Sequence, residues 1–231
     1  MTVNKPLPDR LRGVPLRELP AYPAPRAAQI VRVPPSTLRL WACGDGAHKA
    51  LFPPASTGPL VLSFDNLIEA FVLASMRRVH NLSMQKVRKR LDTVGKKLGY
   101  ERPLLHARFR TDGVRLFVEE ADRILEISHQ VQEVLRGFLD ASLRRIEWEG
   151  DLASRLYPWV RTGQDPADPR SIVIDPRFGF GQPVIAGTGI EARIVAQRYR
   201  AGESFLALAK DYDVAPELIE DAIRCETREA A

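Results

Sequence analysis

The sequence predicts a mainly α-helical protein with small β elements, and two patterns support this fold class. Apolar residues recur at spacings of three or four in several stretches, most clearly over residues 65–79 and 83–98. Runs that favour strands are short, such as Pro59-Leu60-Val61-Leu62 and Ile172-Val173-Ile174. Of the 231 residues, 45% are apolar, which is enough for a buried core in one or two domains.

Changes in composition and pattern divide the chain into five segments. Residues 1–22 are rich in proline and basic side chains and are predicted to form a flexible arm. A helical domain over residues 23–100 follows, then a mixed α/β connecting region over residues 101–161. A polar linker, residues 162–170, precedes a last domain over residues 171–231.

In the first domain, a helix is expected from Ala24 to Val31, followed by a turn at Arg32-Val33. A second helix is expected to start at Pro34-Pro35-Ser36-Thr37 and to run to about Ala42. A strand at residues 59–62 leads to an amphipathic helix over residues 65–79. Ser83 is placed to cap a further helix that runs to Leu98.

The connecting region is less regular. Residues 114–118 are predicted to form a strand after Asp112-Gly113, and residues 124–139 to mix strand and helix. Residues 145–148 and 153–157 are predicted to form a hairpin around Glu149-Gly150-Asp151. The last domain opens with a strand at residues 172–174 and a glycine-rich stretch. Three helices are then expected, over residues 191–200, 204–212 and 216–228.

Charge is distributed unevenly along the chain. Residues 1–110 carry 19 Lys and Arg against 7 Asp and Glu, whereas residues 111–231 carry 15 against 22. This split indicates that the first half meets a polyanion and the second does not. The alternative is a solvated surface whose charge is uneven.

The sequence also excludes some classes of protein. No apolar run is long enough to cross a bilayer, and the N-terminus lacks the apolar segment of a secretion signal, so a cytoplasmic location is expected. Cys43 and Cys225 lie far apart, with no metal-ligand spacing. His48, His80, His106 and His129 are scattered and lie near no candidate nucleophile. We therefore expect no enzyme, metal or cofactor.

The first two helices have the pattern of a helix-turn-helix. Ala28 supplies the small residue needed where two helices cross closely. Apolar residues occupy the positions that must be buried: Ala27, Val31, Val33, Leu38 and Trp41. The second helix would expose Ser36, Thr37, Arg39 and Leu40. Ser, Thr and Arg side chains contact phosphates or base edges in DNA. Two ordinary packed helices would give a similar pattern.

The order of elements over residues 22–98 resembles the MerR-type winged helix-turn-helix. The segments that carry the resemblance are Thr37-Leu38-Arg39-Leu40-Trp41, Leu62-Ser63-Phe64-Asp65-Asn66-Leu67 and Leu82-Ser83-Met84-Gln85-Lys86-Val87-Arg88-Lys89. The long coiled coil and cysteine ligands of MerR metal sensors are absent. Lys86, Arg88, Lys89 and Arg90 are candidates to contact phosphates, although a solvated basic helix face is an alternative.

The last domain resembles the DUF 433 family of antitoxin-associated domains over about residues 170–228. The resemblance rests on Ile172-Val173-Ile174-Asp175-Pro176-Arg177, Gly181-Gln182-Pro183-Val184-Ile185, Gly187-Thr188-Gly189-Ile190 and Ala201-Gly202-Glu203-Ser204. No Gly-Lys-Ser/Thr follows the glycines, so a phosphate loop is not expected. Ile172, Val173, Ile174 and the glycine-rich stretch are candidates for a dimer contact.

This domain also ends in a helix-turn-helix pattern, over residues 205–224, with Ala209 at the small position. Its second helix is expected to expose Glu217, Glu220 and Asp221, and Asp211 and Asp213 lie just before it. Phosphates would repel these carboxylates, so this copy is predicted to bind protein rather than DNA. A solvated acidic face is the alternative.

Taken as a whole, the chain resembles VapB-type antitoxins of type II toxin–antitoxin systems. The resemblance implies a PIN-like ribonuclease toxin as partner and repression of the shared operon through operator DNA. A homodimer is expected, because a single winged helix-turn-helix reads only a short half-site and a two-fold operator needs two copies. Arg224 and Arg228 are candidates to bind carboxylates of the toxin, unless Glu226 and Glu229 pair with them. The alternatives are a MerR-like ligand-responsive regulator and an adaptor protein, each without a toxin.

Overall fold

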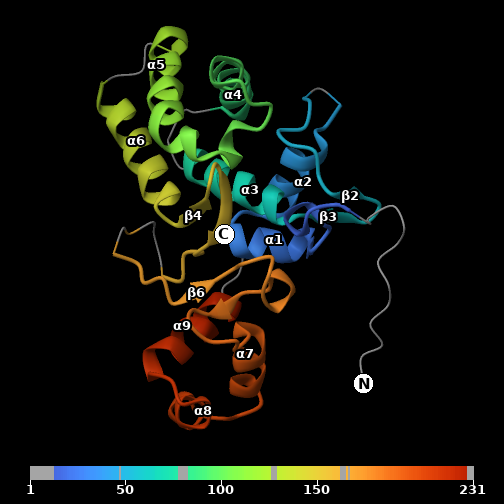
Figure 1. Ribbon diagram of the computed structural model, residues 1–231, viewed down its shortest axis with the longest axis vertical. Coiled ribbons are helices and arrows are strands. Elements are labelled where there is room, and N and C mark those ends of the chain that lie inside the picture. The colour runs from blue at the N-terminus through green and yellow to red at the C-terminus, as the bar shows by residue number, and fades with distance from the viewer. Residues whose placement is uncertain are drawn as a thin grey trace.

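The computed structural model describes residues 13–46, 48–77, 83–125, 129–161, 165 and 167–227, with only the backbone at residues 120–125 and 129. The fold is mainly helical with small sheets, as predicted. Figure 1 shows helices α1 to α6 in one part of the molecule and α7 to α9 in a smaller part below it. One hydrophobic core runs from Tyr22 to Ile174, and a second lies among α7, α8 and α9.

The first two helices form as predicted. Helix α1 (Ala24–Val31) and helix α2 (Pro35–Cys43) are joined by a turn in which Arg32 adopts the left-handed conformation, with φ of 59°. The backbone N–H of Val33 donates to the carbonyl of Ala28, at 3.1 Å. Ala28 is fully buried and Trp41 is 1% exposed. The small residue at the crossing and the inward tryptophan are thus confirmed.

A three-stranded antiparallel sheet lies beside this helix pair. Strand β3 (Leu60–Leu62) pairs with β1 (Tyr22–Pro23) on one side and with β2 (Ser56–Thr57) on the other. Part of the predicted arm therefore packs against the protein. In addition, residues Leu16–Glu18 form a 3₁₀ helix, and Arg17 Nε donates to Asp65 Oδ1 at 2.7 Å.

Helix α3 (Phe64–Arg77) is buried on every side from Phe64 to Met76, so the predicted amphipathic pattern is wrong in its polar face. The helix passes between α1 and α6, which removes it from solvent. Its polar residues are paired instead of solvated. Arg102 donates to the Glu69 carboxylate at 2.6 and 3.0 Å, while burial raises the pKa of Glu69 against these bonds. Such pairing is what permits buried carboxylates.

Helix α4 (Met84–Leu98) begins at the Ser83 cap, as expected. The connecting region that follows it is more helical than predicted. The predicted strand at residues 114–118 is wrong, because this segment belongs to helix α5 (Val114–Leu125). Val114, Phe117 and Val118 lie on one buried face, a spacing that suits a helix as well as a strand.

The remaining predicted mixture also forms a helix, α6 (His129–Leu143). A π-helical turn, Phe109–Gly113, leads into α5 instead of a strand. Gly113 is needed there, because a Cβ at this position would lie 2.5 Å from the Phe109 ring. The hairpin forms as expected from β4 (Ile146–Glu149) and β5 (Leu152–Leu156).

The last part also follows the expectation. Strand β6 (Ile172–Val173) pairs with β7 (Val184–Ile185), and helices α7 (Ala192–Arg200), α8 (Phe205–Tyr212) and α9 (Pro216–Thr227) follow. The two parts of the molecule are in direct contact. The Tyr22 hydroxyl donates to the carbonyl of Gly181 at 2.7 Å, and Arg26 of α1 donates to Glu226 of α9 at 2.6 and 2.7 Å.

Candidate nucleic-acid and protein interfaces

Helix α2 has a buried face and a polar outer face. Leu38 and Trp41 are buried, whereas Ser36, Arg39 and Leu40 are exposed and Thr37 is half-buried. The exposed side chains are those predicted to contact DNA. Arg39 forms no ion pair with another residue in the described ranges, so its guanidinium group is available to a ligand.

The start of α4 lies against the loop that follows α2. The Gln85 amide donates to His48 Nε2, and Arg88 Nη2 donates to the carbonyl of Lys49. His48 Nδ1 in turn bonds to Asp45 at 2.8 Å. These contacts place the exposed side chains of Lys86 and Lys89 near the end of α2. Arg88 is half-buried and already engaged by the loop.

Arg90 is the one predicted phosphate contact that the structure contradicts. Its side chain is fully buried, and its guanidinium carbon lies 5.8 Å from the centre of the Phe117 ring. A buried side chain cannot reach a phosphate on DNA. Arg90 lies on the inner face of α4 with the buried residues Val87 and Val94, because residues three or four positions apart share one face of a helix. Its role is to pack α4 against α5.

Helices α8 and α9 repeat the geometry of the first helix pair. Ala209 is buried at the crossing, Asp213 is left-handed with φ of 53°, and the N–H of Val214 donates to the carbonyl of Ala209 at 3.0 Å. The spacing matches that of Ala28, Arg32 and Val33. In this alignment Glu217 stands where the first pair has Ser36, and Glu220 where it has Arg39.

The acidic residues of α9 divide into exposed and structural groups. Glu217 is exposed and Glu220 is partly exposed. Asp221, predicted to be exposed, is 2% exposed and accepts a hydrogen bond from Ser171 Oγ at 2.7 Å. That prediction is corrected: the side chain of Asp221 fixes α9 to the strand β6 region and offers nothing to a partner.

Of the two predicted toxin-binding arginines, only Arg224 lies within the described residues. Arg224 is exposed but bonds to Glu220 at 2.9 Å and to Asp221 at 3.3 Å, so its guanidinium is already shared by two carboxylates of its own helix. Arg228 lies outside the described residues. Glu226 does not pair with Arg224. It is buried, and both its oxygens accept from Arg26 of α1, at 2.6 and 2.7 Å.

The predicted dimer strand is buried within the chain itself. Ile172 and Ile174 are fully buried, and Val173 is half-buried. Both strand edges are in use, since β6 pairs with β7 and Ile174 pairs with Leu156 of the hairpin. Ile172 and Ile174 therefore cannot form a dimer contact. The adjacent glycine-rich stretch remains open, with Phe178 61% and Phe180 91% exposed.

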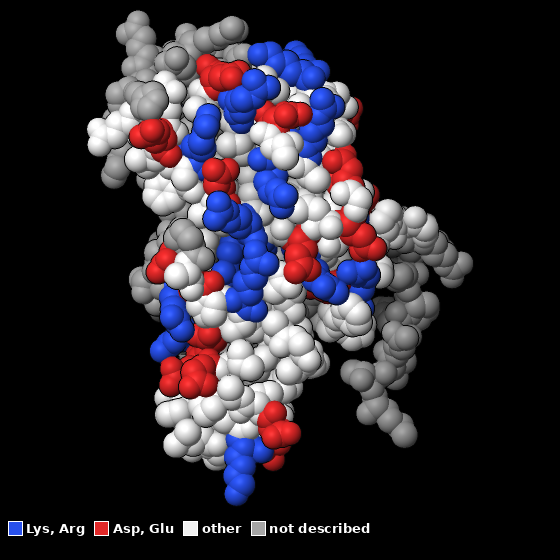
Figure 2. All heavy atoms as spheres, turned by 60° about the vertical axis from the view of Figure 1, so that its left-hand side comes forward, with Lys and Arg blue, Asp and Glu red and all other residues white. Residues whose placement is uncertain are grey.

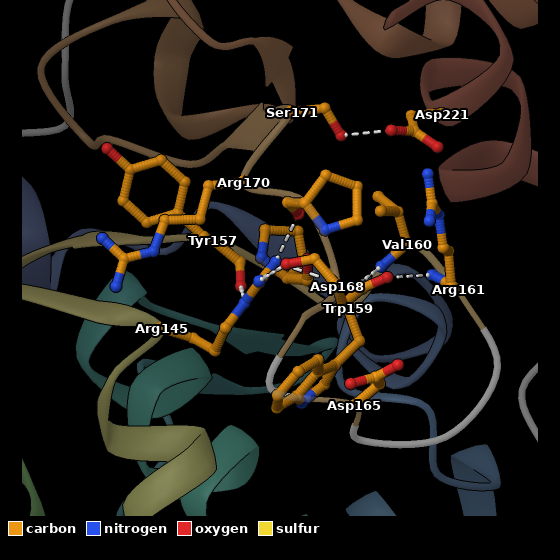
Figure 3. Close-up of polar contacts among 12 residues, drawn as sticks. Arg145, Tyr157, Trp159, Val160, Arg161, Asp165, Asp168, Arg170, Ser171 and Asp221 are labelled. Atoms are coloured by element: carbon orange, nitrogen blue, oxygen red, sulfur yellow. Dashed lines mark hydrogen bonds and ion pairs between the residues drawn. The ribbon is translucent and has the colours of Figure 1, made fainter. Parts of the chain in front are cut away.

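A buried arginine that no sequence pattern predicts holds the junction between the two parts (Figure 3). Arg145 is 3% exposed and donates to the carbonyls of Tyr157, Pro158, Asp168 and Pro169, at 2.5–2.9 Å. Its guanidinium carbon lies 4.7 Å from the centre of the Trp159 ring. Burial lowers the pKa of Arg145, partly offset by the nearby Asp168 carboxylate.

The Asp168 carboxylate adds further hydrogen bonds to this junction. It accepts from the backbone N–H groups of Val160 and Arg161, at 2.8 and 2.9 Å. Asp168 falls in the segment that was predicted to be a polar linker, yet it is 5% exposed. This end of the segment is thus fixed by hydrogen bonds on both sides.

Comparisons with known proteins agree with this architecture. Residues 172–224, from β6 to α9, match the family described as "Protein of unknown function (DUF433)". The chain is 28% identical, over 89% of its length and 93% of the relative, to a Mycobacterium tuberculosis protein named "Putative antitoxin VapB45". The crystal structure of Rv2018 from the same organism superposes with a TM-score of 0.70, at 28% identity, over 89% of this chain and 98% of that one.

These likenesses support an antitoxin-like family and point to a regulatory protein rather than an enzyme. Within the described residues, no three His, Cys, Asp or Glu side chains are grouped to hold a metal ion. None of the described helices has the length and apolar character to span a membrane. Burial raises the pKa of the Cys225 thiol to about 12, so this cysteine stays protonated and unreactive near neutral pH.

Proposed function

We propose that this protein is an antitoxin that represses its own operon by binding operator DNA and neutralises a PIN-like ribonuclease. The observation that carries the DNA-binding part is the exposed polar face of α2 above a buried apolar face. The likeness over most of the chain to a protein named as an antitoxin supports the other part.

The arrangement around α2 supports a winged helix-turn-helix of the MerR type. The pair α1–α2 is followed by the β2–β3 hairpin, which takes the place of a wing, and then by α3 and α4. In such domains the second helix of the pair enters the major groove while flanking elements contact phosphates. Ser36, Thr37 and Arg39 would contact bases or phosphates, and Lys86 and Lys89 phosphates only.

Charge separates the roles of the two helix pairs. The second pair carries Glu217 and Glu220 where the first carries Ser36 and Arg39. Carboxylates at these places would be repelled by DNA phosphates, so α9 is suited to a protein partner. Exposed apolar side chains on the same part of the chain offer further contact area: Ile194, Tyr199 and Leu206.

Toxin binding is accordingly proposed for this last part of the chain. Arg224 would have to leave Glu220 and Asp221 to bind a nuclease carboxylate, which makes it a weaker candidate than the sequence suggested. Arg228 stays a candidate. The exposed phenylalanines of the glycine-rich stretch are proposed as the homodimer contact in place of the buried isoleucines.

The Arg39→Ala variant is expected to weaken binding to the promoter of this protein's own gene by about 1–3 kcal/mol. The reason is loss of a bidentate base contact or a charged phosphate contact. Fluorescence anisotropy of the full chain with labelled promoter DNA, over a range of salt concentrations, measures this. Affinity should also fall steeply with salt, because bound phosphates release counterions.

Arg193→Ala is the matched control, because Arg193 is an exposed arginine on α7, far along the chain from α2. It should bind the promoter as the native chain does. Equal affinity for Arg39→Ala and Arg193→Ala would contradict the proposed role of α2. The same titration gives stoichiometry: a two-fold operator should take two chains, and a single chain per site would contradict the homodimer.

A further inference from the structure

A groove rich in arginine lies between the β4–β5 hairpin and the turn before α5. Its volume is about 940 Å³. We call it the arginine groove, and its charged lining consists of Arg108, Arg110, Arg144, Glu147, Glu149, Arg155, Arg170 and Arg177. Figure 2 turns the side of α6 and β4 toward the viewer and shows Lys and Arg side chains gathered near the middle of that face. None of these residues belongs to α2 or α4, so the groove is separate from the proposed DNA contacts.

Two of the arginines are held in place by carboxylates. Arg155 Nε donates to Asp175 at 2.9 Å, and Arg177 Nη2 donates to the same oxygen at 3.0 Å. Asp175 is 3% exposed. Burial alone would raise the pKa of Asp175, but the bonds from Arg177 and Arg155 outweigh it and the pKa is lowered. Both guanidinium groups are thus fixed in the groove wall.

Glu147 and Glu149 complete this wall. Glu147 accepts from Arg155 Nη1 at 3.1 Å, and Glu149 accepts from Arg177 Nη1 at 2.8 Å. A third arginine, Arg170, is also oriented. Its guanidinium carbon lies 5.2 Å from the centre of the Tyr157 ring, and it donates to the carbonyl of Arg144. Ordered arginines lose little side-chain freedom when a ligand binds.

Arg108 is paired with Asp112 at 3.2 Å, and two further arginines of the groove have no partner among the described residues. Arg110 and Arg144 are both exposed, and neither side chain makes a hydrogen bond or ion pair within the described part of the chain. They come from different elements, the turn before α5 and the end of α6, yet both line the same space. Six arginines thus face two glutamates, and three of them, Arg110, Arg144 and Arg170, have no carboxylate partner among the described residues.

We propose that the arginine groove binds a compact anion of nucleotide size that carries several phosphate groups. The planar guanidinium fork of arginine matches phosphate oxygens two at a time. The volume lies within the range of roughly 300–1,000 Å³ usual for small-ligand sites. Trp148, half-buried in the lining, offers a ring against which a base can stack.

The two glutamates argue for a compact ligand over a nucleic-acid strand. A continuous chain of phosphates would have to pass Glu147 and Glu149, which are 37% and 70% exposed. A small ligand can lie beside Arg110 and Arg144 instead. In the sequence, Arg108 and Arg110 come before the junction held by Arg145, and Arg170 and Arg177 come after it. A ligand in the groove would therefore contact segments on both sides of this junction.

Isothermal titration calorimetry of the full chain tests the proposal with three probes: adenosine triphosphate, tripolyphosphate and a 20-nucleotide single-stranded RNA. The variant is Arg110→Ala/Arg144→Ala. The control is Arg136→Ala/Arg193→Ala, which removes two exposed arginines outside the groove. Adenosine triphosphate should bind the native chain, and the groove variant should bind it at least about tenfold more weakly. The control should keep the native affinity.

Thermal unfolding checks that the groove variant is folded, as expected for two exposed side chains. Stronger binding of adenosine triphosphate than of tripolyphosphate supports a contribution from Trp148, and equal binding leaves a site for phosphate groups alone. Three results overturn the proposal. They are absence of binding by both small probes, equal loss in the groove variant and the control, and binding of the RNA alone.

Discussion

The Arg145→Met variant is expected to lower the free energy of unfolding by about 3–5 kcal/mol. Methionine fills a similar volume but donates no hydrogen bond, so the carbonyls of Tyr157, Pro158, Asp168 and Pro169 lose the donor that satisfies them. Each buried acceptor left unsatisfied costs about 1–3 kcal/mol, reduced where the backbone can relax toward water. Equilibrium unfolding in urea measures the change.

Arg144→Met is the matched control, because Arg144 is the preceding residue and is exposed. Its effect on stability should stay within about 0.5 kcal/mol. A loss for Arg145→Met no larger than that for Arg144→Met would show that the junction does not depend on the buried guanidinium. Since both hydrophobic cores meet the junction, the urea transition of Arg145→Met should also show whether the two parts still unfold together.

The Glu226→Ala variant is expected to lower the free energy of unfolding by about 3 kcal/mol. Its carboxylate receives two hydrogen bonds from Arg26, whose side chain is only 16% exposed, so the change leaves a largely buried charge without its partner. The change weakens the contact between α1 and α9. It therefore weakens the packing of the proposed DNA-binding helix pair against the last part of the chain. Urea unfolding measures this too.

Glu217→Ala, an exposed glutamate of the same helix, is the control and should change stability by about 0.5 kcal/mol or less. A double-mutant cycle with Arg26→Ala isolates the pair. If the two residues act together, the double variant should lose clearly less than the sum of the single losses. Additive losses would mean that the pair contributes nothing beyond its separate packing.

The sequence predicted elements where one local signal decided the outcome. Pro25 and the turn at Arg32-Val33 delimit α1, Ser83 caps α4, and Gly150 marks the hairpin. It did not predict elements whose environment comes from distant parts of the chain. Residues 114–118 suit a strand or a helix locally, and only packing against α4 and α6 makes them helical.

The candidate site shows the same division. Periodicity placed Ser36 and Arg39 outward and Trp41 inward, and the structure agrees. Arg90 was assigned by its charge, although its position in α4 puts it on the same buried side as Val87 and Val94. The periodicity that predicts Val87 and Val94 to be buried therefore also predicts that Arg90 does not contact DNA phosphates.

Other features have no local signal. The bond between Glu226 and Arg26 joins residues 200 positions apart, and Arg145 finds its carbonyl partners up to 24 positions away. The two helix-turn-helix pairs were each predicted from the sequence, whereas the structure shows that their turns share the same hydrogen bond and left-handed residue. The two turns share a buried alanine and a following valine but little else, since Arg32 and Asp213 take the left-handed position.

The most direct test of the antitoxin function is co-expression of the full chain with the product of the neighbouring gene in its operon. If the protein is an antitoxin, that product is a small ribonuclease with a carboxylate cluster. The two proteins should purify together, and the full chain should restore growth to cells in which the nuclease alone stops it. Cells that stay arrested with both proteins present at equal levels, and no complex on purification, would contradict the function proposed for this protein.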